Sequence, residues 1–348
     1  MKLMRIGVDL AKNVFQIHGV DRHEKPIWRQ RLSRDRWLQT VLEKIEPGCE
    51  IGMESCGGAH HWARQLQARG YRVKLIAPQF VKPYVKSNKN DANDAEAICE
   101  AMSRPSMRFV PVKTAEQQAA LMLVGLRERL IRNRTQLANS IRGYAAEFGV
   151  IAAKGLCRIG PLLERIAADV SLPALARELF AIQAKEYALI EAELKVIDVK
   201  LMAWHRDNAC SRRLSQIPGV GLVGASMLVM KTPDPHLFRS GRQFAAWLGL
   251  TPKDHSTAGK VRLGVITRAG DEALRSTLIV GATALLRRVR EGSNRKSSAW
   301  LLEMLRRKPP KLVAVALANK IARIAWKLMV SGETYRANAA SFIAAPAA

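Results

Sequence analysis

The first 80 residues carry the pattern that most limits how this chain can fold. Apolar and polar residues alternate in residues 6–8, 14–20 and 26–32, and a polar turn at 21–25 separates the last two segments. Alternation with a period of two is typical of strands with one buried face. Two further apolar runs, at residues 50–53 and 73–77, lie next to helical segments at 36–44 and 59–70. Three hairpin strands followed by strand–helix units predict a mixed α/β sheet.

The rest of the chain is predicted to be mostly helical. Residues 114–203 form long helices, and an apolar stripe at spacings of three, four or their sum predicts an antiparallel hairpin or coiled coil: Leu175, Leu179, Ile182, Ile190, Leu194, Ile197 and Leu201. The last two helices are separated by Pro309 and Pro310. We therefore expect an α/β domain at 1–113, a helical coiled-coil middle at 114–206, a mostly helical domain at 207–335 and a flexible tail at 336–348.

The charge of the chain indicates a polyanionic partner. Lys and Arg number 56 against 30 Asp and Glu, which gives a formal net charge of +26. A cationic surface gains free energy when it releases the counterions condensed on a phosphate backbone. An anionic membrane is the other candidate, but no apolar run approaches the roughly 20 residues needed to span a bilayer. Nucleic acid is therefore the expected partner, and no membrane is expected.

The cysteines and the start of the chain favour a reducing compartment. The five cysteines are odd in number, widely spaced and without a C-x-x-C pair, so they support neither a zinc site nor a disulfide framework. Residues 1–6 lead directly into a strand pattern without the apolar segment of a signal peptide. We expect a cytoplasmic protein, associated with the nucleoid of a prokaryote.

Four acids lie where carboxylates can converge. Asp9 and Glu54 each end an apolar strand, and Asp91 and Asp94 lie three residues apart at a predicted helix start. Spacing i, i+3 places the last two on one helix face. Hard oxygen ligands of this kind suit a pair of divalent cations acting on a phosphodiester. The alternative is local: Asp91 would cap the helix, Asp94 would complement its dipole, and Asp9 would be a turn residue.

The acidic segments resemble the three motifs of the DEDD transposases, the insertion sequence 110 family, which includes the Piv-type DNA invertases. The matching segments are Gly7-Val-Asp9-Leu-Ala-Lys12, Met53-Glu54-Ser-Cys-Gly57 and Asn90-Asp91-Ala-Asn-Asp94-Ala95. The resemblance covers about residues 4–330, with the motifs in the expected order. It implies a RuvC-like, ribonuclease-H-like N-terminal domain, in which Asp9, Glu54, Asp91 and Asp94 bind Mg²⁺ or Mn²⁺.

A glycine-containing segment near residue 219 is a candidate phosphate contact. Residues 214–225 match a helix–hairpin–helix pattern, in which Gly219 and Gly221 allow a tight turn that points backbone N–H groups at a phosphate. Such a turn holds a nucleic-acid backbone without reading bases. The alternative is a plain glycine-rich helix connection. In the resembled family, a similar segment opens the C-terminal transposase domain.

A polar, cationic loop follows at residues 252–270. It contains Lys260, Arg262 and Arg268, which we assign to nucleic-acid binding with Gly219 and Gly221. The resemblance aligns Ser256 with the family's serine nucleophile. The family has glycine at the next position, where this chain has Thr257, so Thr257 is an alternative nucleophile. His60 and His61, after the Gly57-Gly58 turn, are expected on a polar helix face and receive no catalytic role.

The resemblance implies a recombinase that excises and inserts its own mobile element. Its expected partners are double-stranded DNA at the element ends and target, a structured guide RNA, and further copies of the chain in a homodimer or homotetramer. Two alternatives stay open: a RuvC-like nuclease or junction resolvase that uses water, and a non-catalytic nucleic-acid scaffold. Metal-dependent cleavage separates the scaffold from both enzymes. A covalent protein–DNA adduct separates the recombinase from the nuclease.

Overall fold

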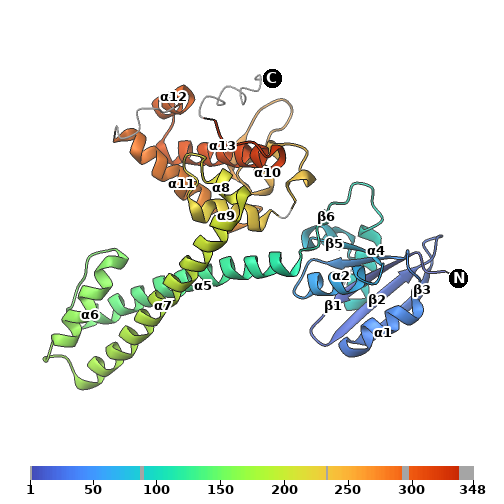
Figure 1. The fold of residues 1–348 in the computed structure, drawn as a ribbon, viewed down its shortest axis with the longest axis horizontal. Helices are drawn as coiled ribbons and strands as arrows, with labels where there is room; N and C mark the ends of the chain where they lie inside the picture. Colours follow the sequence, from blue (N-terminus) through green and yellow to red (C-terminus); the bar gives the residue numbers. More distant parts are fainter. Residues whose placement is uncertain (1, 87–89, 233, 292–297, 337–348) are drawn as a thin grey trace. The chain divides into compact units, whose positions relative to one another are not determined.

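The chain forms two compact units in a computed structural model that describes residues 2–86, 90–232, 234–291 and 298–336 (Figure 1). The units are Met1–Glu116 and Gln117–Ala348. The predicted tail at 336–348 lies outside the described residues apart from its first residue. No helix in these described ranges combines the length and apolar character needed to cross a membrane.

A six-stranded mixed sheet forms the centre of the first unit, as predicted. Its order is β3-β2-β1-β4-β5-β6. The first three strands are an antiparallel meander, β4 and β5 run parallel to β1, and β6 is antiparallel to β5. Their bounds are β1 Arg5–Leu10, β2 Val14–Val20, β3 Pro26–Ser33, β4 Glu50–Glu54, β5 Arg72–Ile76 and β6 Phe109–Val110. The sequence did not predict β6, because two residues are too few to show a period.

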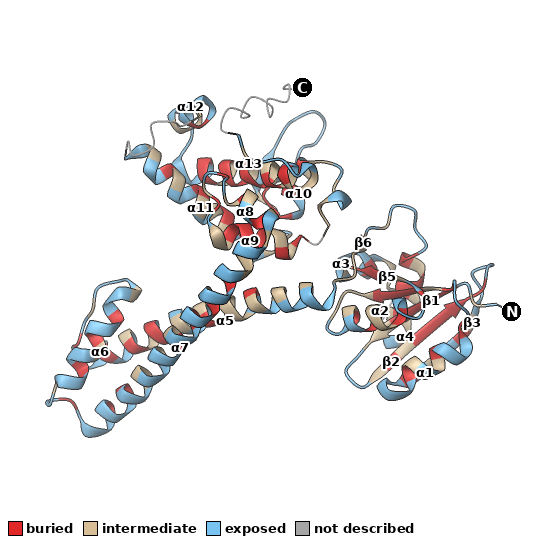
Figure 2. Ribbon diagram, in the orientation of Figure 1, coloured by how far each residue is buried: buried red, intermediate tan, exposed pale blue. Residues whose placement is uncertain are grey.

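The two faces of the sheet have different characters. Ile6 and Val8 of β1 are fully buried in the core beneath helices α1 (Arg34–Lys44) and α2 (Ala59–Gln67). Because side chains alternate along a strand, Arg5, Gly7 and Asp9 face the other way. Helix α4 (Asp91–Ala101) packs on that second face, against β1 and β2. The strands at the centre of this unit are buried (Figure 2).

Helices α5 (Ala115–Glu147) and α7 (Ala174–Asp207) run antiparallel in the second unit. Arg127 Nε lies 2.6 Å from Asp198 Oδ1, and Arg134 Nη1 lies 2.9 Å from Glu191 Oε1. Position 127 thus pairs with 198 and position 134 with 191, so sequence number falls along α7 as it rises along α5. A hairpin of long helices was predicted, and α6 (Ile159–Ala168) packs between their connected ends.

The predicted apolar stripe on α7 is correct in its second half and wrong in its first. Ile190, Leu194, Ile197 and Leu201 are buried. Leu175, Leu179 and Ile182 are instead 67%, 52% and 60% exposed. Near the start of α7, the buried positions belong to Ala176 and Phe180, which join the core that α6 contributes to. The buried face is therefore displaced by one position where α6 packs beside α5.

The C-terminal part of the second unit is built around α13 (Pro310–Ser331). This helix packs against α11 (Glu272–Arg290) and α10 (Gly241–Trp247), with α8 (Ala209–Leu214), α9 (Leu222–Lys231) and α12 (Ala299–Arg307) completing the core. Lys231 Nζ lies 2.9 Å from both Glu128 of α5 and Asp271, which caps α11. The predicted loop at 252–270 contains a short hairpin of β7 (Pro252–Asp254) and β8 (Leu263–Ile266).

Candidate metal centre and serine hairpin

Helix α4 lies unusually close to the sheet because the strands beneath it present glycine. A Cβ atom at Gly7 of β1 would overlap with the carbonyl oxygen of Ala95 and lie 2.5 Å from the backbone nitrogen of Cys99. At Gly52 of β4, a Cβ atom would lie 2.5 Å from the Met102 sulfur. Only residues without a side chain allow this approach. The first turn of α4 is thereby held near the end of β1.

This close packing brings three of the four predicted acids together. One carboxylate oxygen from each of Asp9, Asp91 and Asp94 lies within 4.8 Å of the other two. Asp9 and Asp94 are half-buried, whereas Asp91 is exposed. The donors come from the second face of β1 and the first turn of α4, two elements about 80 residues apart in the sequence. Hard carboxylate oxygens at this separation fit a divalent cation such as Mg²⁺ or Mn²⁺.

Glu54 lies at the same edge of the sheet. Val8 of β1 pairs with Met53 of β4 in parallel register, so Asp9 and Glu54 follow at the next position of neighbouring strands. Both strands run in one direction, so the two side chains point to the face covered by α4. The Cys56 thiol lies near both acids. Burial raises the pKa of this thiol, and the negative charges of Glu54 and Asp9 raise it further. Glu54 is not within the close cluster of three aspartates.

The helix start is capped by Asn90, not by Asp91. The Asn90 side chain accepts a hydrogen bond from the backbone N–H of Ala92 at 2.9 Å. The local interpretation of Asp91 as the helix cap is therefore wrong. With Asn90 in the capping position, the carboxylates of Asp91 and Asp94 belong to the first helical turn, where the dipole favours negative charge.

Two further contacts fix α4 on the sheet. The guanidinium of Arg5, which is buried, donates from Nε to the carbonyl oxygen of Cys99 at 3.0 Å and pairs with Glu24. On the neighbouring side, Glu96 lies 3.2 Å from Arg29 and 3.2 Å from Lys86. These contacts hold the middle and the C-terminal part of the helix that carries Asp91 and Asp94. Sequence reasoning missed them because no local pattern links such distant positions.

The Gly7 contact leads to a stability prediction. Gly7→Ala should lower the free energy of unfolding by about 1–3 kcal/mol or more, because the added methyl group meets backbone atoms that cannot rotate away. It should also weaken binding of Mn²⁺, since α4 must move with its two aspartates. Urea unfolding and the metal-induced rise in melting temperature measure the two effects. Gly57→Ala is the matched control, because a Cβ atom there meets no atom within 4 Å.

Ser256 lies in the hairpin of the second unit. Thr257 and Lys260 exchange backbone hydrogen bonds of 3.3 and 2.9 Å across a two-residue turn. The turn residues Ala258 and Gly259 both have positive φ, 46° and 79°, as hairpin turns of this length require. The Ser256 hydroxyl accepts a hydrogen bond from the backbone N–H of Arg262 at 3.0 Å. Ser256 and Thr257 are both exposed.

The predicted nucleic-acid contacts lie in the second unit as well. Lys260 and Arg262 are exposed on the serine hairpin, and Arg268 is exposed at its base with a φ of 56°. Gly219 has a φ of 87° and packs against the backbone of Gly281 in α11. A side chain at position 219 would crowd that backbone, so glycine is needed here for packing. Gly221 precedes α9 and has open space around it.

The base of the serine hairpin is held by residues that sequence reasoning missed. Arg275 of α11 is buried and donates to the carbonyl oxygens of Leu248 at 3.2 Å and Gly270 at 3.0 Å. The Asn319 amide donates to the carbonyl oxygen of Leu250 at 3.2 Å. Both ends of the hairpin are thus tied to the helical core. The sequence gives little sign of these contacts, because one arginine among many in a basic chain does not show that it is buried.

His60 has a structural partner that the sequence did not indicate. Its Nδ1 accepts the backbone N–H of Lys113 at 3.2 Å, and its Nε2 lies 2.9 Å from Lys113 Nζ. Burial, followed by the charges of Lys113 and Arg64, lowers the pKa of His60 to about 4. His60 therefore holds the chain just before α5 as a neutral imidazole. Exposed His61 packs against the Trp62 ring.

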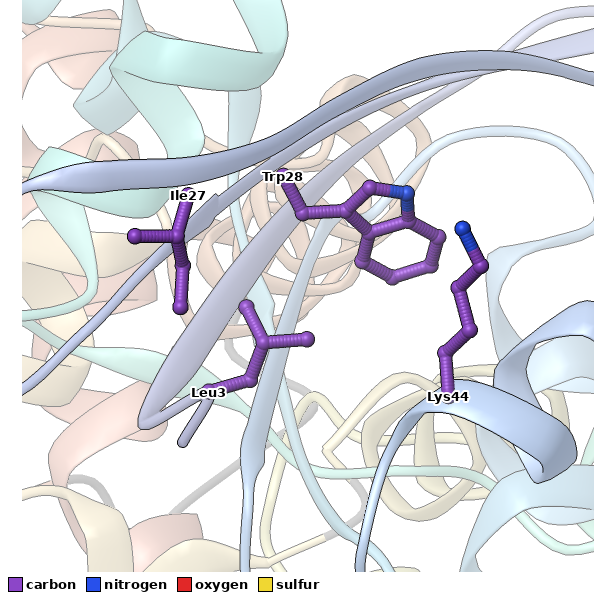
Figure 3. A pocket seen from close by; sticks show the side chains of 4 residues that line it. All are labelled: Leu3, Ile27, Trp28 and Lys44. Atoms are coloured by element: carbon purple, nitrogen blue, oxygen red, sulfur yellow. The ribbon is translucent and has the colours of Figure 1, made fainter. Parts of the chain in front are cut away.

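A hollow elsewhere in the first unit does not contain the acids. It is lined by Leu3, Ile27, Trp28 and Lys44, whose ammonium lies 5.4 Å from the centre of the Trp28 ring (Figure 3). None of these lining residues is a carboxylate. Three clustered aspartates on a strand end and a helix start, beside a strand-terminal glutamate, instead match the acids that the DEDD resemblance assigns.

Comparison with known proteins shows the family. A family model of the DEDD transposases of IS110 type matches residues 6–148, and one described as the transposase IS116/IS110/IS902 family matches residues 211–297. The transposase for insertion sequence element IS1111A of Coxiella burnetii is 42% identical, covering 96% of this chain and 92% of the relative. The transposase for element IS1328 of Yersinia enterocolitica is 39% identical, covering 95% of this chain and 98% of the relative. The transposase y4pF/y4sB of Sinorhizobium fredii is 68% identical, covering 96% of this chain and 86% of the relative.

The chain belongs to the IS116/IS110/IS902 family of transposases. It is a DNA transposase, as the resemblance implied, and DNA is its substrate. The first family model spans all four acids, and the second spans Ser256.

Proposed function

We propose that this transposase cleaves and rejoins DNA through two half-sites, one in each unit. Asp9, Glu54, Asp91 and Asp94 hold Mg²⁺ or Mn²⁺, and Ser256 is the nucleophile that forms a covalent link to DNA. The observation that carries the proposal is the convergence of Asp9, Asp91 and Asp94 within 4.8 Å. Three aspartates so close together are costly without a cation, because like charges repel.

Each part of the chain has a defined task in this reaction. The carboxylates hold divalent metal, which when bound offsets charge on the scissile phosphate. Ser256 supplies the attacking oxygen, and the exposed Lys260, Arg262 and Arg268 contact neighbouring phosphates. The Gly221 turn before α9 is a further backbone contact for the nucleic acid. Ser256 is preferred to Thr257, because its hydroxyl accepts a hydrogen bond from the Arg262 backbone N–H.

Two features support a RuvC-like first domain and a divided second unit. The strand order places an antiparallel meander beside two parallel strands, with the first acid on the central strand β1. This is the order that the resemblance implies for the ribonuclease-H-like fold. In the second unit, α5, α6 and α7 share one buried cluster, and α8–α13 build another, which Val124 of α5 and Leu201 of α7 join. We therefore keep the proposed boundary between a helical middle and a C-terminal domain near residue 207.

We further propose a structured RNA guide and self-association through α7. The net charge of +26 permits binding of a second polyanion besides DNA, and α7 leaves an apolar stripe exposed: Leu175, Ile182, Leu189 and Val196. These residues recur every seven positions, the repeat of helices that pair in a coiled coil. A dimer or tetramer would cover the stripe.

Nucleic-acid binding should show steep salt dependence. If six to ten phosphates are contacted, the affinity should fall by about 10³–10⁵ between 50 and 200 mM salt, because counterion release is lost. Fluorescence anisotropy with duplex DNA and with RNA transcribed from the element measures this.

The double substitution Ile182→Glu and Leu189→Glu should shift the protein to monomers in analytical ultracentrifugation, because it places charges in the exposed apolar stripe of α7. Salt-independent binding, or a wild type that is monomeric with and without RNA, would contradict these proposals.

The direct test is strand cleavage by the wild-type protein. End-labelled DNA carrying the element end is incubated with Mg²⁺ or Mn²⁺ and RNA from the element, and resolved on denaturing gels. A covalent protein–DNA adduct that disappears with a chelator is the expected result. Metal-dependent cleavage without an adduct would favour the water-using nuclease, and binding without cleavage would favour the scaffold.

A further inference from the structure

The strand pairing of the meander places a row of side chains across the sheet, starting at the aspartate cluster. Asp9 of β1 pairs with Gln16 of β2, and Gln16 pairs with Arg31 of β3. Directly paired residues on neighbouring strands have their side chains on the same face of a sheet. Phe15 and Leu32, which flank this row, are buried in the core on the opposite face. Gln16 and Arg31 therefore lie on the face that carries the acids.

The row opens to solvent at β3. Helix α4 packs against β1 and β2, and β3 is an edge strand of the sheet. Along the row, Asp9 and Gln16 are half-buried and Arg31 is exposed. From backbone to backbone, Arg31 lies about 10 Å from Asp9, because neighbouring strands are about 4.8 Å apart. A polar track thus leads from the edge of the sheet to the aspartate cluster.

Arg31 is a cation without an acidic partner, unlike its neighbours. Arg29, two residues away on the same face, lies 3.2 Å from Glu96, and Lys86 pairs with the same acid. Within the residues that the structure describes, the Arg31 guanidinium makes neither an ion pair nor a hydrogen bond. A guanidinium binds a phosphate well, because its planar group can donate two parallel hydrogen bonds to the phosphate oxygens.

We propose that the DNA strand to be cleaved reaches the metal centre over β3 and β2, and that Arg31 binds one of its phosphates. This inference rests on the proposed function, in which Asp9 and the other acids hold the metal at the scissile phosphate. Phosphates follow one another every ~3.4 Å along a strand, so Arg31 contacts a phosphate within about three nucleotides of the scissile one. Arg31 is a positioning residue: it holds the strand at the metal without reading bases.

Arg36 provides a matched control on the other side of the sheet. It is exposed on α1, the helix that covers the face opposite to the acids. Within the described residues, its side chain also lacks an ion pair. Arg31→Ala and Arg36→Ala each remove one positive charge from the same unit, so a general effect of net charge is equal in both. Because both side chains are exposed, both variants should keep the melting temperature of the wild type.

The test measures the affinity of the full chain for element-end DNA, with RNA from the element and Mg²⁺. Arg31→Ala should weaken DNA binding about tenfold, the loss of one charge-assisted hydrogen bond. It should also reduce the slope of log affinity against log salt concentration by about one, because one phosphate contact is missing. Arg31→Lys restores the charge and should recover part of the affinity, and Arg36→Ala should match the wild type.

DNA with a single uncharged methylphosphonate near the scissile phosphate locates the contact. At one position, the wild type should lose as much affinity as Arg31→Ala loses on unmodified DNA. Arg31→Ala should lose little more at that position, because its contact is already absent. If the two losses are additive at every position, Arg31 acts through the fold and not through a phosphate, and the inference is overturned.

The outcomes separate this inference from the proposed function. If Asp9→Asn loses cleavage while Arg31→Ala binds DNA as Arg36→Ala does, the metal site stands and the route over β3 is overturned. If Asp9→Asn cleaves like the wild type, the proposed metal site fails, and the inference that rests on it fails as well.

Discussion

Asp9→Asn should reduce metal-dependent strand cleavage by at least about 10³-fold. Asp9 supplies the only strand-borne oxygen in the cluster with Asp91 and Asp94, and an amide offers a neutral oxygen in its place. Bound metal contributes several kcal/mol to stabilising phosphoryl charge, and each ~1.4 kcal/mol is a factor of ten in rate. Cleavage of end-labelled DNA over a range of Mg²⁺ and Mn²⁺ concentrations measures the loss. Asp91→Asn should behave alike.

The same variant should keep its fold. Removing one charge from three crowded carboxylates relieves repulsion, so the melting temperature without metal should stay equal or rise. The stabilisation that Mn²⁺ gives the wild type should be lost. Asp35→Asn is the control, since this exposed acid of α1 lies outside the cluster. Full cleavage by Asp9→Asn would exclude the acids as the metal site.

Ser256→Ala should bind DNA and metal like the wild type but form neither adduct nor recombinant product. Without the hydroxyl no covalent bond to phosphorus can form, so the loss should be complete within detection. The hairpin should persist, because Arg262 N–H can return to the His255 carbonyl of the regular ladder. Denaturing gels detect the adduct, and mass spectrometry of the peptide containing residue 256 locates the phosphate.

Thr257→Ala is the matched control for this experiment. The Thr257 backbone closes the turn with Lys260, but within the described residues the Thr257 hydroxyl makes no hydrogen bond. The variant should therefore retain adduct formation near the wild-type rate. An adduct that survives in Ser256→Ala and vanishes in Thr257→Ala would move the nucleophile by one residue.

Much of the first unit could be predicted, because its information is local. Strands that alternate in polarity define their own faces, so the meander, β4 and β5 follow from the sequence. Asp9 could be placed at a strand end and Asp91 and Asp94 on one helix turn from spacing alone. Their convergence could not, because it depends on α4 packing against Gly7 and Gly52. A glycine that permits a close approach resembles any other strand glycine in the sequence.

The features that the sequence did not reveal depend on which helix, strand or side chain packs against another. On α7, the buried face changes where α6 packs beside α5, so one continuous stripe could not describe both halves. The loop at 252–270 pairs only Pro252 and Asp254 with β8, too short a run for a strand pattern. His60 meets Lys113 across 53 positions, and no periodicity reports such a contact.

The two-residue turn at Ala258 and Gly259 makes the serine hairpin sensitive to length. In paired strands, successive side chains point to opposite faces, so inserting or deleting one residue between Ser256 and Lys260 reverses every face beyond it. Such a change would turn the Ser256 hydroxyl away from Arg262 N–H even if every residue type were kept. Substitutions at exposed hairpin positions other than the positive-φ turn residues Ala258 and Gly259 cost little by comparison. Evolution of this transposase can therefore change the composition of the hairpin far more easily than its number of residues.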